Sequence, residues 1–173
     1  MSSSPQTPAT AYPPVSVIMP ILNEEHHLRD AVGSVLAQDY PGGMEVVVAV
    51  GPSRDRTHEV ADALAAEDPR VVVVDNPGGR TPDGLNAAIA ASTHQVVVRM
   101  DGHGALSEGY IRRAVEVLEE TGAANVGGVM LAEGTGDLQQ AVAVAMRSPL
   151  GIGSARFHVG GHAGPADTVY LGV

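Results

Sequence analysis

The sequence predicts an α/β fold, with a mostly parallel sheet that carries helices on both faces. Short runs rich in valine alternate with longer segments of helical periodicity, which is typical of successive β-α units. Each run is apolar at nearly every position, as expected for parallel strands that are covered on both sides. Four strands are therefore expected, at residues 15–21, 44–50, 71–74 and 95–100.

The segments between these runs have the spacing of amphipathic helices. The first segment carries one apolar stripe, formed by Leu28, Ala31, Val32, Val35 and Leu36. Weaker stripes predict helices at residues 58–66, 84–92 and 107–120. Beyond residue 125 the pattern loosens; it predicts a glycine-broken strand at 126–131, a helix at 138–146, a glycine-rich loop at 151–165 and a strand at 168–173.

The chain is expected to form one domain preceded by a leader. With 173 residues, of which 44% are apolar, it is long enough to bury a single core. Residues 1–14 have neither the basic start nor the apolar centre of a signal peptide, so we expect a disordered leader there and a domain at 15–173. The last run ends without the polar or capping residues that usually close a domain, which predicts truncation at the C-terminal end.

The composition excludes several classes of function. The absence of cysteine rules out disulfides, thiolate metal sites and thiol nucleophiles. A formal net charge of −10 disfavours nucleic acid and anionic membranes as partners, because both need local excesses of lysine and arginine. No stretch approaches the roughly 20 apolar residues that span a bilayer, so we expect a soluble, cytoplasmic chain that reaches the inner face of a membrane only through other segments. An unfinished sheet edge would favour homo-oligomers.

Polar residues follow each strand, and ligands bind beyond the carboxyl ends of the strands in an open parallel sheet. After the first run come Pro20, Asn23 and Glu24. The proline removes a ladder hydrogen bond, Asn23 is placed to cap the next helix, and Glu24 is placed to face the ligand crevice. A plain helix start, with acids favoured by the helix dipole, explains the segment equally well.

Two further turns offer contacts for a nucleotide. Asp55 lies near the start of the second helix, where it can cap that helix or accept a hydrogen bond from a uracil-like base. The glycine-rich stretch after the third run opens a helix with exposed amides, a favoured place for phosphates, and Arg80 adds a positive charge there. An ordinary glycine-rich surface loop accounts for the same residues.

The sharpest feature is the segment Asp101-Gly102-His103, which follows a buried strand without an intervening polar turn. Asp101 and His103 are two residues apart, so both side chains project to the same side of an extended segment, while Gly102 lets a ligand approach the backbone. A carboxylate and a neutral imidazole suit Mn²⁺ or, less well, Mg²⁺, and such an ion would bridge two phosphates of a departing nucleotide. The alternative is that Asp101 caps the next helix beside a solvated His103.

Taken in order, these segments resemble the family 2 glycosyltransferases of the GT-A fold, a Rossmann-like architecture, and within them the succinoglycan-type exopolysaccharide glucosyltransferases. Four segments carry the resemblance: the first-strand signature at 15–25, the base-recognition turn at 53–57, the segment beside the nucleotide at 84–88, and 101–103 at the place of the metal-binding Asp-x-Asp motif. His103 departs from the pattern, because it replaces the second acid of that motif.

The resemblance implies an enzyme, a hexosyltransferase that moves a sugar with inversion to a saccharide or lipid-linked acceptor. The donor it implies is a nucleoside diphosphate sugar, with UDP as the expected nucleotide. The roles it implies are metal and diphosphate binding by Asp101 and His103, ribose and base recognition by Glu24 and Asp55, and phosphate positioning by Arg80 and Asn86. The carboxylate that deprotonates the acceptor is expected beyond Val173, so Asp167 is not assigned this role and the chain alone need not be active.

Two other classes of protein stay open. A nucleotidyltransferase shares a doubly wound sheet and a metal, but it usually has a glycine-rich basic loop near the first strand, where this chain has Asn23-Glu24-Glu25. A non-catalytic nucleotide-binding module would bind its nucleotide tightly without turnover. Sugar transfer or donor hydrolysis by a longer form of the protein distinguishes these classes.

Overall fold

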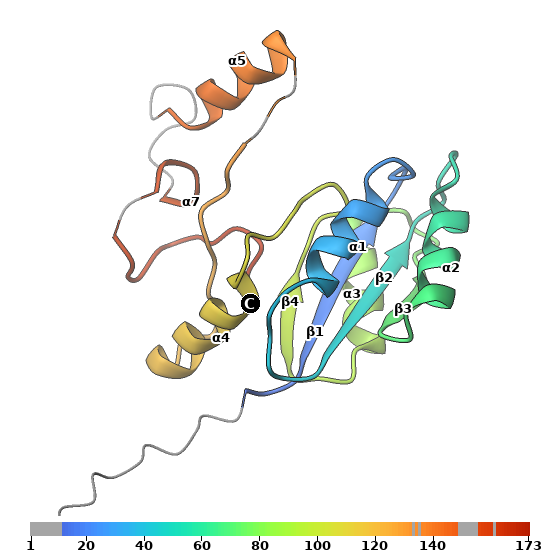
Figure 1. Ribbon diagram of the computed structural model, residues 1–173, viewed down its shortest axis with the longest axis horizontal. Helices are drawn as coiled ribbons and strands as arrows, with labels where there is room; N and C mark the ends of the chain where they lie inside the picture. Colours follow the sequence, from blue (N-terminus) through green and yellow to red (C-terminus); the bar gives the residue numbers. More distant parts are fainter. Residues whose placement is uncertain (1–11, 133, 135, 149–155, 161) are drawn as a thin grey trace, which may run out of the picture.

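A parallel sheet forms the centre of the molecule in the computed structural model, which describes residues 12–132, 134, 136–148, 156–160 and 162–173. The strands are β1 (Val15–Ile21), β2 (Met44–Val50), β3 (Val71–Asp75) and β4 (Val96–Arg99), in the spatial order β3-β2-β1-β4. The helices are α1 (Leu28–Leu36), α2 (Thr57–Glu67), α3 (Thr81–Ala91), α4 (Tyr110–Thr121), α5 (Asp137–Met146) and α7 (Arg156–Val159) (Figure 1). All three strand pairs are parallel, so the predicted α/β class is confirmed.

The strands bury apolar side chains on both faces of the sheet. On one face Val17 and Val48 belong to the larger cluster, which α1, α2 and α4 cover. On the other face Ile18 and Val47 pack with Ala88 of α3 in a smaller cluster. Successive residues of a strand point to opposite faces, which is why a sheet covered on both sides requires runs of consecutive apolar residues.

A group of polar side chains fixes the register at the amino ends of β1, β2 and β4. β1 pairs with β2 so that Ser16 lies opposite Glu45, and the Ser16 hydroxyl donates to the Glu45 carboxylate at 2.5 Å. The backbone N–H of Thr93 donates to the same carboxylate oxygen at 2.6 Å, and His94 N–H donates to the Ser16 hydroxyl at 3.2 Å. Burial alone would raise the pKa of Glu45, but these hydrogen bonds from Ser16 and Thr93 favour the ionised form and lower it.

Two of the helices begin a few residues away from the positions that periodicity predicts. α3 begins at Thr81 instead of residue 84, because Pro82 is favourable in the first turn of a helix, where its missing N–H is not needed. α4 begins at Tyr110 instead of residue 107, after Gly109, which adopts a left-handed conformation with φ 72°. The four predicted strands are confirmed, although β4 is one residue shorter at each end.

The described residues between 122 and 173 have less regular structure than the periodicity predicts. The strands expected at 126–131 and 168–173 are wrong, because the structure has only an isolated antiparallel bridge there, between Gly128 and Tyr170. Val126 and Val173 exchange two backbone hydrogen bonds beside it, at 2.9 and 2.8 Å. Two adjacent glycines at 127–128 weaken strand formation, since glycine contributes no side chain to pack.

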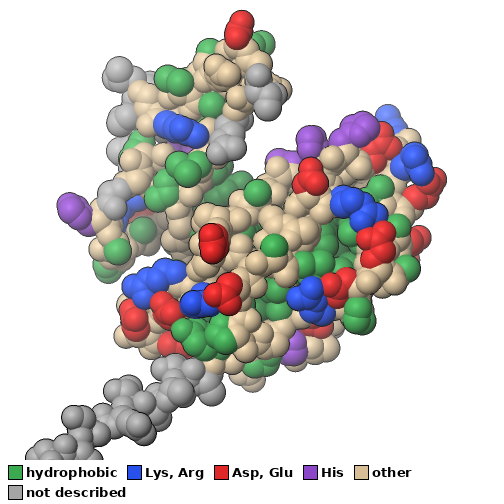
Figure 2. Space-filling model, viewed as in Figure 1, with side chains coloured by type: hydrophobic (Ala, Val, Ile, Leu, Met, Phe, Trp, Pro, Cys, Tyr) green, Lys and Arg blue, Asp and Glu red, His purple; other side chains and the backbone are tan. Residues whose placement is uncertain are grey.

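The remaining predictions for the C-terminal part divide between described and undescribed residues. α5 confirms the helix expected at 138–146. Part of the loop expected at 151–165 lies outside the described residues, and its described part contains α7. In Figure 1, α5 and α7 lie apart from the sheet, and Figure 2 shows this part of the molecule as a separate lobe.

The described chain begins before β1. Residues 1–11 of the expected leader lie outside the described residues, but residues 12–14 are in place instead of forming part of that leader. The Tyr12 hydroxyl donates to Glu116 of α4 at 2.8 Å. The rings of Tyr12 and Tyr40 pack edge-on, with their centroids 5.7 Å apart. Among the described residues, no helix combines the length and the apolar character needed to cross a bilayer.

Candidate functional site

A pocket of about 250 Å³ opens where β1 and β4 separate at their carboxyl ends. Pairing of the two strands ends with Ile18 opposite Arg99, after which Met100 N–H donates to the Ile18 carbonyl at 3.0 Å. Pro20 follows two residues later on the same side of β1 and has no N–H to continue the ladder. After β3, at one edge of the sheet, the chain returns to form β4 on the other side of β1. The strand order therefore reverses between β1 and β4, and this position is the topological switch point of the sheet.

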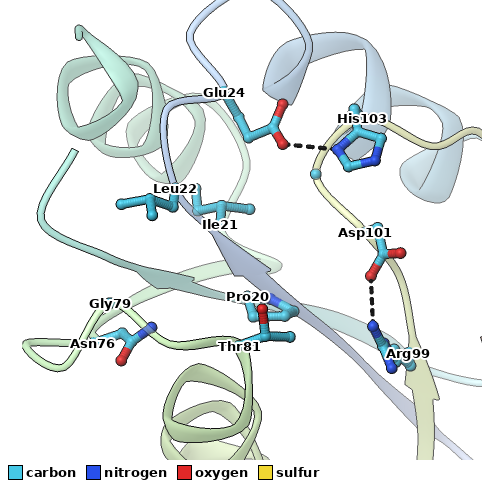
Figure 3. A pocket seen from close by; sticks show the side chains of 11 residues that line it. Pro20, Ile21, Leu22, Glu24, Asn76, Gly79, Thr81, Arg99, Asp101 and His103 are labelled. Atoms are coloured by element: carbon cyan, nitrogen blue, oxygen red, sulfur yellow. Dashed lines mark hydrogen bonds and ion pairs between the residues drawn. The ribbon is translucent and has the colours of Figure 1, made fainter. Parts of the chain in front are cut away.

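Three segments of the chain line this pocket (Figure 3). They are the end of β1 and the loop after it, the turn between β3 and α3, and the segment that follows β4. The lining residues are Pro20, Ile21, Leu22, Glu24, Asn76, Gly79, Thr81, Arg99, Asp101, Gly102 and His103. The structure therefore brings together four of the predicted site residues, Pro20, Glu24, Asp101 and His103.

Asp101 is held by two neighbours, neither of which the sequence indicated. Arg99 Nη2 lies 3.1 Å from Asp101 Oδ1, and the Tyr170 hydroxyl donates to Oδ2 at 3.2 Å. Burial raises the pKa of Tyr170, and the negative charge of Asp101 raises it further, so this phenol keeps its proton and acts as a donor. α4 begins only at Tyr110, so Asp101 does not cap a helix.

His103 pairs with Glu24 across the pocket. Its Nδ1 lies 2.8 Å from Glu24 Oε1, and the glutamate side chain is 14% exposed whereas the imidazole is 65% exposed. Gly102, between the two predicted metal ligands, is buried, and a Cβ there would lie 2.8 Å from Ile21 Cγ2 and 3.0 Å from Glu24 Cγ. The glycine is therefore required for Glu24 to pass over the backbone and reach the imidazole.

The loop after β1 is bound to the turn after β2 by hydrogen bonds. Asn23 has a positive φ of 58°, its N–H donates to Ser53 Oγ at 3.0 Å, and its Oδ1 accepts from Arg54 N–H at 2.8 Å. α1 begins five residues later, at Leu28, so Asn23 stabilises this corner and does not cap the helix. It lies outside the pocket.

Asp55 also lies outside the pocket, with its carboxylate engaged by the protein. Oδ1 accepts hydrogen bonds from Thr57 N–H and from the Thr57 hydroxyl, at 3.1 and 2.5 Å, and Oδ2 accepts one from Glu25 N–H at 3.1 Å. Burial alone would raise the pKa of Asp55, but these hydrogen bonds outweigh it and lower the pKa. The bonds from Thr57 lie at the start of α2, but the N-cap residue of this helix is Arg56, so Asp55 does not take the capping role that was one of its two alternatives.

The two predicted phosphate contacts on the α3 side are not assembled either. Arg80 donates to the Asp83 carboxylate, at 2.9 and 3.1 Å, and Asn86 is exposed one turn into α3. The positive charge that does line the pocket belongs to Arg99, whose Nε is buried without a hydrogen-bond partner in the described part of the chain. A charged residue inside the valine-rich run at 95–100 was the signal that sequence reasoning could have used.

The acidic and imidazole side chains suit a divalent cation only in part. The described residues contain no group of three or more His, Cys, Asp or Glu side chains placed to enclose a metal. Asp101 and His103 are instead held by different partners, as Figure 3 shows. One carboxylate and one imidazole nevertheless fit a cation that takes its other ligands from phosphate and water, as Mg²⁺ commonly does.

A pocket at the switch point of a doubly wound sheet is typical of a class of α/β proteins that bind nucleotides. Within that class, the sequence model described as glycosyl transferase family 2 matches residues 16–165. The chain belongs to this family. The resemblance inferred from four short segments is thereby confirmed over most of the chain.

Individual relatives agree with this assignment. The chain is 35% identical to the succinoglycan biosynthesis protein ExoA of Rhizobium meliloti over 146 residues, which are 83% of this chain and 44% of ExoA. It is 29% identical to the glycosyltransferase AglE of Haloferax volcanii over 118 residues, which are 67% of this chain and 39% of AglE. The chain thus spans less than half the length of these relatives.

Solved structures of glycosyltransferases share the fold. The mannosyltransferase PcManGT of Pyrobaculum calidifontis, in complex with GDP-Man and Mn²⁺, is 28% identical with a TM-score of 0.63, over 69% of this chain and 36% of that one. S. aureus TarS in complex with UDP is 21% identical with a TM-score of 0.61, over 70% and 37%. The expected GT-A fold is confirmed by these structures.

Proposed function

We propose that this chain carries the donor-binding half of an inverting enzyme that transfers a sugar from a nucleoside diphosphate, UDP by preference, to a saccharide or lipid-linked acceptor. The similarity to ExoA supports a role in exopolysaccharide synthesis. TarS structures in complex with UDP and with UDP-GlcNAc support the donor class, and the GDP-Man complex of PcManGT supports a divalent cation as cofactor.

The charge of the switch-point pocket is the observation that carries this proposal. Its side chains include two carboxylates, Glu24 and Asp101, and one guanidinium, Arg99. A diphosphate adds further negative charge, so binding it here requires another cation beside Arg99. Mn²⁺ or Mg²⁺ between Asp101, His103 and the phosphates meets that need.

Three pocket residues, and Asp55 outside the pocket, then have defined tasks. Arg99 pairs with the diphosphate in place of the predicted Arg80, because Arg99 lines the pocket and Arg80 does not. Asp101 and His103 would hold the cation, which when bound supplies charge stabilisation to the departing diphosphate. Asp55 positions the loop that carries Glu24, a role that its three hydrogen bonds support better than direct base recognition.

Sugar transfer with inversion also needs a base for the acceptor hydroxyl. Asp167 is exposed and does not line the pocket, so we assign it no such role. We expect this base in the part of the relatives that extends beyond the matched region.

Calorimetric titration tests the donor site. We expect UDP to bind more tightly in the presence of Mn²⁺ than in its absence, since the pocket charge must be compensated. UDP should also bind more tightly than GDP, because UDP is the nucleotide that the resemblance implies. Asp101→Asn should abolish the metal-dependent part of the binding. Asp30→Asn is the matched control, because it removes one exposed carboxylate from α1, away from the pocket.

The outcomes separate the parts of the proposal. UDP binding that is indifferent to Mn²⁺ and to Asp101→Asn would contradict the cation assignment and leave a nucleotide site. No binding of either nucleotide by the folded protein would contradict the donor site as a whole. Donor hydrolysis by a longer form of the protein that carries this domain would exclude a non-catalytic binding module.

A further inference from the structure

We propose that Glu24 is a positioning residue, which holds the imidazole of His103 so that its Nε2 is free to bind the divalent cation. This inference rests on the proposed function, and it assigns to Glu24 a task other than ribose recognition. It concerns the position that departs from the family pattern, where an imidazole stands in place of a second acid.

The contact between the two side chains defines which nitrogen carries the proton. Glu24 Oε1 lies 2.8 Å from His103 Nδ1. An ionised carboxylate can only accept a hydrogen bond, so Nδ1 must be the protonated nitrogen of a neutral imidazole. Nε2 then carries a lone pair, and in Figure 3 it lies on the side of the ring away from Glu24, toward Asp101. Carboxylates commonly orient metal-binding histidines in this way.

Glu24 is itself fixed by a short chain of hydrogen bonds. Its backbone N–H donates to Thr57 Oγ1 at 2.7 Å, and the hydroxyl of this fully buried threonine donates to Asp55 at 2.5 Å. Asp55 in turn accepts from the N–H of Glu25. The turn after β2 therefore fixes the backbone position of Glu24.

Contact with the backbone at Gly102 restricts the path of the Glu24 side chain toward His103. The Glu24 side chain crosses directly over Gly102, at a distance that leaves no room for a Cβ. The imidazole of His103, which the Glu24 carboxylate contacts, is 65% exposed, so packing alone does not restrict its rotation. Glu24 supplies the restraint that the surrounding protein does not.

Nitrogen NMR of His103 in the metal-free protein tests the first part of the inference. At a pH at which the imidazole is neutral, we expect a protonated Nδ1 and an unprotonated Nε2. Glu24→Ala should shift the ring toward the opposite tautomer, which dominates in free histidine. Glu24→Gln keeps a carbonyl acceptor of the same length and should restore part of the wild-type signal, whereas Asp30→Ala should leave it unchanged.

Binding of Mn²⁺ in the presence of UDP, measured by electron paramagnetic resonance, tests the second part. We expect Glu24→Ala to weaken Mn²⁺ affinity by about 10-fold to 100-fold, the range seen when a residue that orients a metal ligand is removed. His103→Ala should weaken it at least as much, and adding Glu24→Ala to His103→Ala should have little further effect. Equal additional loss in the double variant would show that Glu24 acts independently of His103 and would overturn the inference.

The two measurements distinguish this inference from the proposed function. A protonated Nε2, or protons on both nitrogens, in the wild-type protein would overturn the inference even if Mn²⁺ binds. Wild-type Mn²⁺ affinity in Glu24→Ala would overturn it too. Failure of the wild-type protein to bind Mn²⁺ with UDP would overturn the metal-assisted function and this inference with it, whatever the tautomer.

Discussion

Residues 12–121 and 122–173 differ in how they use their apolar side chains. In the first region the strands and α1 to α4 bury them against one another, on both faces of the sheet. In the second, the described residues contribute only Ala143 and Val173 to the buried apolar set, while Leu131, Leu138 and Val144 are more than 60% exposed. The comparison indicates that a buried core stabilises the first region and that the described residues of the second region contribute little to it.

The pocket follows the same division. Every residue that lines it comes from the first region. The second region reaches the pocket through the hydrogen bond from Tyr170 to Asp101 and through the Gly172 carbonyl, which accepts a hydrogen bond from Arg99 N–H at 3.0 Å. The rings of Phe157 and Tyr170 are stacked, with their centroids 6.0 Å apart, so α7 contacts the same tyrosine. The second region is therefore expected to adjust the site without building it.

The largest effect should come from a matched pair of leucine substitutions, one in each region. Leu28→Ala empties a fully buried position in α1 and should lower the free energy of unfolding by about 2–5 kcal/mol. Leu138→Ala removes a side chain that is 79% exposed in α5 and should change it by less than about 0.5 kcal/mol. Urea denaturation of both variants measures the difference, and similar losses would contradict the comparison.

A smaller effect is expected from the side-chain hydrogen bond between Tyr170 and Asp101, which links the regions at the site. Tyr170→Phe removes the donor to Asp101 Oδ2 but leaves Arg99 in place, so Mn²⁺ affinity in the presence of UDP should fall by about 10-fold. Tyr12→Phe is the matched control, because its hydroxyl binds Glu116 on α4, away from the pocket. Equal affinities of the two variants would mean that the second region does not influence the cation site.

The smallest effect concerns an ion pair on the surface of the first region. The guanidinium of Arg70, at 2.7 Å, lowers the pKa of Asp68 to about 2. Because the folded pKa lies below the ordinary value of about 3.9, the pair stabilises the fold above that value and loses its contribution as the pH falls toward 2. In Arg70→Gln the Asp68 pKa, followed by NMR titration, should rise toward 3.9, with little change in the urea midpoint at neutral pH. A large drop in that midpoint would show that this region depends on surface charge more than its core suggests.

The sequence predicted the sheet well because its signal is strong. The four valine-rich runs are confirmed as strands, and the rule that ligands lie beyond strand ends placed Pro20, Glu24, Asp101 and His103 in one pocket. Strand position follows from local composition, so it needs no knowledge of the packed fold.

The contacts within the site could not be predicted in this way. Glu24 and His103 are 79 residues apart, and Tyr170 and Asp101 are 69 apart. Such pairs depend on the strand order and on the exact path of the loops, which single residues do not reveal. The position of Arg80 depends on local helix geometry instead, because Asp83 three residues later competes for its guanidinium.

The hydrogen bonds between Ser16, Glu45 and Thr93 bear on how the chain finds its native pairing. β1 and β2 are apolar at nearly every position, so β2 could slide along β1 by two residues and still present apolar side chains on the correct face. The packing energy alone hardly separates these alignments. Sliding β2 along β1 would leave the Glu45 carboxylate without the Ser16 hydroxyl, at a cost that valine contacts do not recover. The Glu45 carboxylate at the amino end of β2 thus removes near-degenerate shifted pairings of the two inner strands from the folding landscape.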